Sequence, residues 1–232
     1  HDRYKNDSLC IAGGCGNNSV ANGKIKRNSR YKNVYIQSAA GDAGGAIGAA
    51  FVVYHRQNTK TEKKFCMDHA YFGHSFEDDY VASTIKEYDE KLSQQGCVVE
   101  KIVQEKLLLQ RTAEAISEGK VIGWFQGRME WGPRALGNRS ILGDPRRSDM
   151  KDILNLKIKR RESFRPFAPS ILRDKVSDWF EEDDDVPFMM KVFQVRKEKR
   201  SVIEAVTHAD GSGRLQTVYE HTNSRYYNLI KT

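Results

Sequence analysis

Short apolar runs separated by glycine turns mark the first sixty residues. Residues 9–12 and 34–36 are apolar and too short for helices, so they predict buried strands. Residues 18–27 and 43–55 predict helices, and the second is rich in small side chains that allow close packing. This order, in which a strand, a glycine turn and a helix occur two times in succession, predicts an α/β layer.

After residue 64 the pattern changes to longer helical segments and scattered strands, which indicates an α+β second part. Gly119 is expected to act as the C-cap that ends the predicted helix of residues 104–117. The predicted helices are residues 77–95, 104–117 and 150–158, with a helical pattern again at 226–232; the predicted strands are residues 121–125, 167–172, 192–195 and 215–218. Residues 57–64 are polar and charged, and residues 181–185 form an acidic loop. We therefore divide the chain into residues 1–64, a connecting segment 65–103, and residues 104–232.

Composition places the chain among soluble globular proteins. Of its 232 residues, 39% are hydrophobic and 30% charged. The longest apolar run, residues 43–53, is shorter than the roughly 20 residues that span a bilayer, so no membrane association is expected. The four cysteines form no CxxC pair, which predicts reduced thiols, no zinc site and a cytoplasmic location. The polar start without methionine predicts an excised fragment.

Positive charge is concentrated in one stretch. The net charge is +7, and residues 128–165 contain eleven basic and five acidic side chains, nearly the whole surplus. A local positive field of this kind attracts phosphates, on small molecules or on nucleic acid.

Two glycine turns carry candidate nucleotide chemistry. Gly13 and Gly14 follow a predicted strand, where the absence of Cβ atoms lets an anion approach the backbone before a helix. Asp42 lies in a second glycine turn before a helix, and by itself it suits a helix N-cap as well as a metal or phosphate ligand.

Two basic segments carry candidate phosphate chemistry. Residues 126–142 (QGRMEWGPRALGNRSIL) combine three arginines with glycines and a proline, which present guanidinium groups from an irregular backbone. Residues 159–169 (KRRESFRPFAP) mix cations with apolar rings, so some of these cations are expected to be buried and to need anionic partners. For Arg147 and Arg160 a solvated charge remains the alternative.

Together with residues 9–25 and 37–50, and with residues 205–218 (AVTHADGSGRLQTV), these segments resemble the nodulation and antibiotic O-carbamoyltransferases. The resemblance implies that residues 1–64 end an actin-like ATPase (ASKHA) domain. It also implies that residues 104–232 form most of a YrdC-like carbamoyltransferase domain. Ser38 and Glu204 stand where the family has proline, and the family's histidine pair from an earlier segment is missing.

The resemblance also implies the site residues. ATP would lie on Gly13, Gly14, Asn18 and Gly41, and Asp42 would bind an Fe²⁺-like metal, with Mg²⁺ as a further candidate. We expect Arg134, Lys159, Arg165 and Arg214 to act in catalysis. The expected substrate-binding residues are Arg128, Arg139, Arg161, His208, Asp210 and Ser212. His208 taken alone is typical of a core or turn histidine.

The activity implied is formation of carbamoyl-adenylate from carbamoyl phosphate and ATP, followed by transfer to a hydroxyl-bearing acceptor; this chain alone is expected to transfer nothing. The sequence specifies neither the acceptor nor the oligomeric state. Two alternatives stay open: a tRNA-modifying or RNA-binding protein, and a non-catalytic nucleotide-binding scaffold. Arginines interleaved with glycine and proline, with few aromatic residues for base stacking, argue against nucleic acid.

Overall fold

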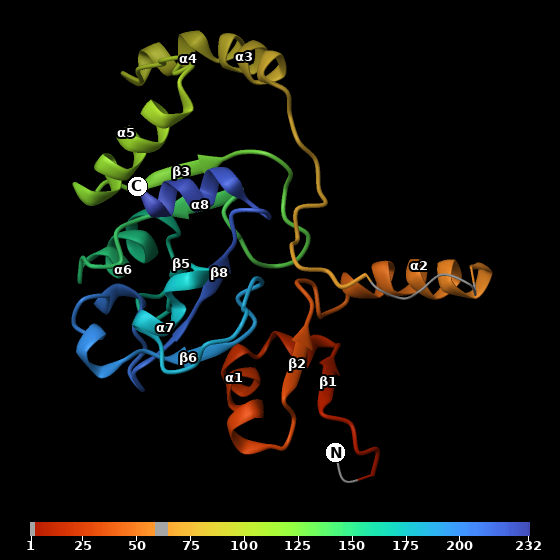
Figure 1. The fold of residues 1–232 in the computed structure, drawn as a ribbon. Coiled ribbons are helices and arrows are strands. Elements are labelled where there is room, and N and C mark those ends of the chain that lie inside the picture. The colour runs from red at the N-terminus through yellow and green to blue at the C-terminus, as the bar shows by residue number, and fades with distance from the viewer. Residues whose placement is uncertain (1–2, 59–64) are drawn as a thin grey trace.

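A computed structural model describes residues 3–58 and 65–232 of the chain. Helices and strands are mixed, and the strands of this described part pair into four separate two-stranded sheets (Figure 1). The helices are α1 (Ser19–Asn28), α2 (Gly44–Gln57), α3 (Asp78–Glu87), α4 (Asp89–Gln94), α5 (Glu105–Ser117), α6 (Met150–Asp152), α7 (Val176–Trp179) and α8 (Ser224–Lys231). The strands are β1 (Ser8–Ile11), β2 (Asn33–Ile36), β3 (Ile122–Phe125), β4 (Arg139–Leu142), β5 (Ser170–Leu172), β6 (Val192–Gln194), β7 (Ser212–Arg214) and β8 (Gln216–Val218).

The first part is a β1–α1–β2 unit, as the sequence predicts. β1 and β2 are parallel, with Leu9 opposite Val34, and α1 crosses between them. Asn18 begins α1 by accepting a hydrogen bond from the Ala21 N–H at 3.1 Å. Helix α2 extends away from this unit (Figure 1) and leaves Phe51 and Tyr54 exposed. The predicted polar exit at residues 57–64 lies mostly outside the described residues.

The second part follows most of the predicted pattern, but helix α7 was not predicted and three other features differ. The helix predicted over residues 77–95 is two helices, α3 and α4, because Tyr88 has non-helical backbone angles. Strands β4 and β7 were not predicted, because their arginine, serine and glycine residues are typical of loops. Residues 150–158 are one turn of α-helix followed by a π-helical turn, Ile153–Ile158. Gly119 adopts φ 84° at the end of α5, as expected of a C-cap.

The arginine-rich segment is largely the connection of an antiparallel hairpin. β3 and β4 pair with Trp124 opposite Ser140, and the loop between them contains Arg128 and Arg134. β5 pairs in parallel with β8, and β6 pairs antiparallel with β7. This pairing of distant strands brings Arg214, at the end of β7, to the same region as the arginine loop.

One apolar cluster joins the two parts of the chain. Ile36 and Ala40 from the first part pack with Leu136, Phe188 and Met190 from the second, and all are nearly fully buried. Burial of the four larger side chains contributes about 1.5–3 kcal/mol each. The first part is therefore held against the second by a shared core.

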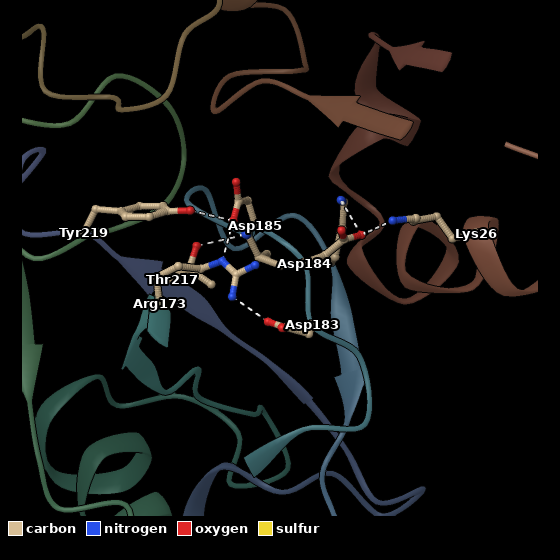
Figure 2. Close-up of polar contacts among 9 residues, drawn as sticks. Lys26, Arg173, Asp183, Asp184, Asp185, Thr217 and Tyr219 are labelled. Carbon is tan, nitrogen blue, oxygen red and sulfur yellow. Dashed lines mark hydrogen bonds and ion pairs between the residues drawn. The ribbon is translucent and has the colours of Figure 1, made fainter. Parts of the chain in front are cut away.

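Polar contacts reinforce this junction (Figure 2). The buried amide of Asn22 donates to the Gly16 carbonyl at 2.7 Å and to the Met190 carbonyl at 2.8 Å. Lys26 on α1 pairs with Asp184 of the acidic loop at 2.6 Å. In the same loop Asp185 accepts from the Tyr219 hydroxyl at 2.7 Å. The Lys26–Asp184 ion pair thus joins α1 to the acidic loop.

No helix within residues 3–58 or 65–232 combines the length and apolarity needed to cross a bilayer.

Candidate anion-binding site

A cavity of about 1030 Å³ lies in the second part of the chain. Its apolar lining comes from α5, β4, α8 and the π-helical turn and includes Ile116, Leu142, Leu154 and Leu229. Its lining cations are Arg134, Arg146, Lys151, Lys159, Arg161 and Arg214, and its lining acids are Glu114 and Asp144. A cavity lined by both apolar and cationic side chains suits a ligand that carries a ring and phosphates.

Three guanidinium groups, those of Arg134, Arg161 and Arg214, converge in this cavity. Burial, and then the charges of Arg134 and Arg161, lower the pKa of Arg214 to about 10. Burial also lowers the pKa of Arg134. Like charges are costly at short range, so this grouping is unfavourable unless an anion joins it.

Neither Arg134 nor Arg214 forms an ion pair with any residue of the described ranges. The Nε atoms of both are buried and lack a hydrogen-bond partner there. Arg134 makes one long contact, from Nη2 to the Asn17 carbonyl at 3.5 Å. Buried donors without acceptors cost about 1–3 kcal/mol each, so the two side chains are prepared for an oxyanion.

A buried carboxylate shapes the loop that carries Arg134. Glu130 Oε1 accepts from the backbone N–H groups of Leu136, Asn138 and Arg139 at 2.7, 2.8 and 3.2 Å. Glu130 was not predicted from the sequence, although a single acid among arginines and glycines is a usable signal. By bending residues 130–139 around itself, Glu130 turns Arg134 toward the cavity.

Two glycines permit this bend. Gly132 has φ 122°, and a Cβ there would lie 2.5 Å from the Ser38 carbonyl oxygen. Gly137 has φ 102°, and a Cβ there would lie 2.3 Å from the ring of Tyr226. Both positions combine a left-handed backbone with a close neighbour, so only glycine fits.

The second basic segment contributes two cations to the cavity. Lys159 lines it with an exposed side chain. Arg161 lies over the Phe167 ring at 4.9 Å and donates from Nε to Asn155 Oδ1 at 2.6 Å. The apolar ring thus fixes the cation without neutralising it.

Three predicted arginines do not line the cavity. Arg165 is exposed and pairs with Glu162 at 2.8 Å. Arg128 donates to the Gly73 carbonyl at 3.0 Å. Arg139 donates to the Gln126 carbonyl at 2.5 Å and stacks on Phe125 at 3.6 Å. In this structure Arg128 and Arg139 therefore brace the arginine loop, and only Arg134, Lys159 and Arg214 of the predicted catalytic set meet.

The predicted histidine turn lies beside the cavity but does not line it. Ser212 Oγ is 2.7 Å from Asp210 Oδ1 and 3.1 Å from His208 Nδ1. Burial lowers the pKa of His208, so this side chain is neutral at pH 7. The turn leads directly into Arg214, two residues beyond Ser212, and so fixes where that arginine emerges.

The two glycine turns of the first part lie together at one end of the β1–β2 sheet. The Gly13 N–H donates to the Ala40 carbonyl at 2.6 Å. A Cβ at Gly13 or Gly14 would meet nothing within 4 Å, and one at Gly41 would lie 3.1 Å from the Asn17 amide. The open space at Gly13 and Gly14 is where a ligand could approach the backbone.

Asp42 by itself does not fit a metal site. Its side chain is exposed, and no group of three histidine, cysteine or acidic residues gathers within the described ranges. Asp42 is not the helix N-cap either, because Ala43 is the residue that precedes α2 and no side chain caps that helix. An Fe²⁺-like ion needs several ligands, so no chemical step is assigned to a metal.

Comparison with known proteins identifies relatives over nearly the whole chain. Residues 113–232 match the family described as carbamoyltransferase C-terminus, and residues 1–51 match carbamoyltransferase N-terminus. The chain is 44% identical over 251 residues to an uncharacterized protein of Synechocystis, covering 97% of this chain and 39% of that protein.

Two further relatives have functional names. Nodulation protein NolNO of Sinorhizobium fredii is 40% identical over 225 residues, covering 96% of this chain and 32% of that protein. The 3'-hydroxymethylcephem-O-carbamoyltransferase of Streptomyces clavuligerus is 33% identical over 224 residues, covering 96% of this chain and 39% of that protein. The chain spans less than half the length of each.

Proposed function

Because this chain belongs to the carbamoyltransferase family, we propose that its basic cavity binds carbamoyl phosphate and ATP. The full-length protein would then form carbamoyl-adenylate and move the carbamoyl group to a hydroxyl-bearing acceptor. In this proposal residues 104–232 act as a YrdC-like domain, and residues 1–64 are the end of an actin-like ATPase domain. One relative is a cephem O-carbamoyltransferase, which supports a hydroxyl as the acceptor.

The observation that carries the proposal is the pair Arg134 and Arg214. Both guanidinium groups are partly buried, both have a buried Nε without a partner among the described residues, and both face one cavity. Removing water from two phosphorylated substrates strengthens their mutual repulsion. Fixed cations offset that repulsion and also the charge that develops as phosphate bonds exchange.

The reaction balances as follows. The adenylate retains a single phosphorus, so the phosphoryl group of carbamoyl phosphate leaves as inorganic phosphate with consumption of one water. The remaining carbamate oxygen attacks the α-phosphorus of ATP and displaces pyrophosphate. The acceptor hydroxyl then attacks the carbamoyl carbon, AMP leaves, and the hydroxyl proton is released. Arg134, Lys159 and Arg214 bind the phosphate oxygens in the first two steps.

The glycine turns at Gly13, Gly14 and Gly41 form the proposed second site. Asn18 begins α1 there, and the N–H groups of a helix start favour an anion. The Arg134–Asn17 contact joins this turn to the basic cavity. We place the nucleotide of the transfer step at this turn.

Calorimetric titration of this chain with ATP and with carbamoyl phosphate tests the cavity. We expect Arg214→Ala and Arg134→Ala each to weaken binding at least tenfold. Arg225→Ala serves as a control, because Arg225 is exposed, pairs with Glu105 at 3.1 Å and lies outside the cavity. Equal binding by the wild type and both cavity variants would refute the site.

The activity is tested on the full-length protein by carbamoyl-phosphate-dependent exchange of pyrophosphate into ATP. The exchange should disappear in Arg214→Ala and persist in Arg225→Ala. Survival of the exchange in Arg214→Ala would refute the catalytic role of this arginine, whereas the absence of any exchange in the wild type would leave the scaffold role. RNA binding that weakens steeply with salt, without any exchange, would favour the RNA role.

A further inference from the structure

Asn155 is a fully buried polar residue to which the proposed activity gives no role. Its exposed fraction is 0%, and it lies in the π-helical turn Ile153–Ile158. Widened turns of this kind are rare and concentrate at functional sites. The turn ends where the basic segment 159–165 begins, and Leu154 and Lys159 on either side of Asn155 both line the cavity.

All hydrogen-bonding groups of the Asn155 side chain are directed to that basic segment. Its Nδ2 donates to the carbonyls of Ser163 and Arg165 at 3.2 and 2.9 Å. Its Oδ1 accepts from Arg161 Nε at 2.6 Å. Its backbone carbonyl also accepts from the Arg161 N–H at 2.9 Å. One side chain thus closes the loop and holds one of its cations.

The loop needs such an anchor. Arg160 has a left-handed φ of 47°, which is unfavourable for a residue with a side chain. Arg161 is also held near Arg214, whose proton affinity its charge lowers. Without a fixed acceptor, Arg161 would relieve this repulsion by turning into solvent.

The group that accepts the Arg161 hydrogen bond is the neutral amide oxygen of Asn155. A carboxylate at position 155 would hold Arg161 as firmly but would offset its charge, as Asp144 does for Arg146 at 2.7 Å in the same cavity. An amide oxygen fixes the guanidinium and leaves the full positive charge for a ligand. Arg146 is therefore a structural cation whose charge is offset by Asp144, whereas Arg161 keeps its charge for a bound anion.

We infer that Asn155 is a positioning residue that presents Arg161 to the phosphates of the bound substrate and holds the loop 159–165 in a fixed conformation beside the cavity. The inference rests on the proposed function for the identity of the anion. The anchoring of the loop can be tested without it.

The first experiment is limited trypsin digestion of the ligand-free chain, followed by mass spectrometry of cuts after Lys159, Arg160 and Arg161; Arg165 is followed by Pro166 and is therefore not a trypsin site. We expect Asn155→Ala to speed these cuts at least tenfold over wild type. Asn28→Ala, an exposed asparagine at the end of α1, should leave them unchanged. Equal cleavage of Asn155→Ala and wild type would overturn the inference, whether or not the chain binds ATP.

The second experiment is a double-mutant cycle on ATP affinity. A charge-assisted hydrogen bond accounts for about a tenfold change in affinity, so Asn155→Ala and Arg161→Ala should each weaken ATP binding about tenfold. If Asn155 acts through Arg161, the double variant should bind about as weakly as Arg161→Ala. A roughly hundredfold loss in the double variant would show independent roles and refute the inference.

Thermal melting of each variant checks folding. If Asn155→Ala does not fold, Asn155→Asp replaces it at nearly the same volume. This change keeps the acceptor for Arg161, adds a negative charge and removes both donors to the loop, so ATP affinity should fall and loop cleavage should rise. Wild-type ATP affinity in a folded Asn155→Asp variant would contradict the inference. A wild-type chain that binds no ATP would instead refute the proposed function, and trypsin digestion would still decide on Asn155.

Discussion

Replacing Arg214 by methionine should make the ligand-free protein more stable while removing its anion affinity. Methionine has a similar length and no charge, so it fills the same space in the cavity wall. Burial and the charges of Arg134 and Arg161 lower the pKa of Arg214 to about 10. A shift of this size corresponds to roughly 3 kcal/mol of unfavourable free energy for the charged form.

We expect a gain of about 1–2 kcal/mol, because water reaches part of the guanidinium and screens its charge. For a chain of this size that gain raises the melting temperature by roughly 2–8 °C. Since the folded-state pKa lies below the unfolded one, the penalty is fully present below pH 10 and fades as the pH rises further. The stability difference between variant and wild type should therefore be constant from pH 6 to about pH 9.

Arg146→Met is the matched control, because Arg146 lines the same cavity but is paired with Asp144. The Asp144 side chain is 5% exposed, so losing its partner should destabilise the protein by about 1–3 kcal/mol. Thermal and urea denaturation give the stabilities, and calorimetry with ATP gives the affinities. If Arg214→Met lowers the melting temperature as Arg146→Met does, the account of Arg214 as a strained, unpaired cation is refuted.

Three further predictions concern the support of the site. Gly137→Ala should lower the free energy of unfolding, measured by urea denaturation, by at least about 2 kcal/mol, because the added Cβ would lie 2.3 Å from the Tyr226 ring and the backbone φ is 102°. An unchanged stability would show that the arginine loop can shift. Asn22→Ala should lower the free energy of unfolding by about 2–3 kcal/mol, because it leaves the Gly16 and Met190 carbonyls without their donor. Asn28→Ala is the exposed control, and equal stabilities of the two variants would argue against a fixed junction. Lys26→Glu should lower the free energy of unfolding by less than about 1 kcal/mol, because the side chains of Lys26 and Asp184 are 39% and 32% exposed. This loss should shrink at high salt, and a loss independent of salt would contradict an electrostatic cause.

The proposed site was only partly predictable from the sequence. Arg134, Lys159 and Arg214 were expected to meet and they line one cavity. Arg165 carries the same chemistry but pairs with Glu162, three residues away. The composition of a loop shows that cations are present, but it does not show the direction in which each side chain leaves the backbone.

The residues that organise the site gave weaker signals. Glu130 and Asn155 are both buried and bind backbone or side-chain groups of the loops that they shape. Polar residues in basic loops look solvated in a sequence. Glu130 is buried by the loop that folds around it, and Asn155 by the basic segment to which its side chain is bonded, and neither fold is visible in the sequence.

The sequence by itself determined the β1–α1–β2 unit, most helices and the cationic character of two segments, because glycine turns, apolar period and charge act over a few neighbouring residues. Only the tertiary structure decided which cations stay unpaired. Arg128 is occupied by the Gly73 carbonyl, Arg146 by Asp144, and Arg214 by no described residue. Those assignments depend on strands β4 and β7, whose pairing partners set them in place although their own sequences are typical of loops. A long-range contact therefore gives Arg128 a structural role, a local pair does so for Arg146, and the fold leaves Arg214 free for a ligand.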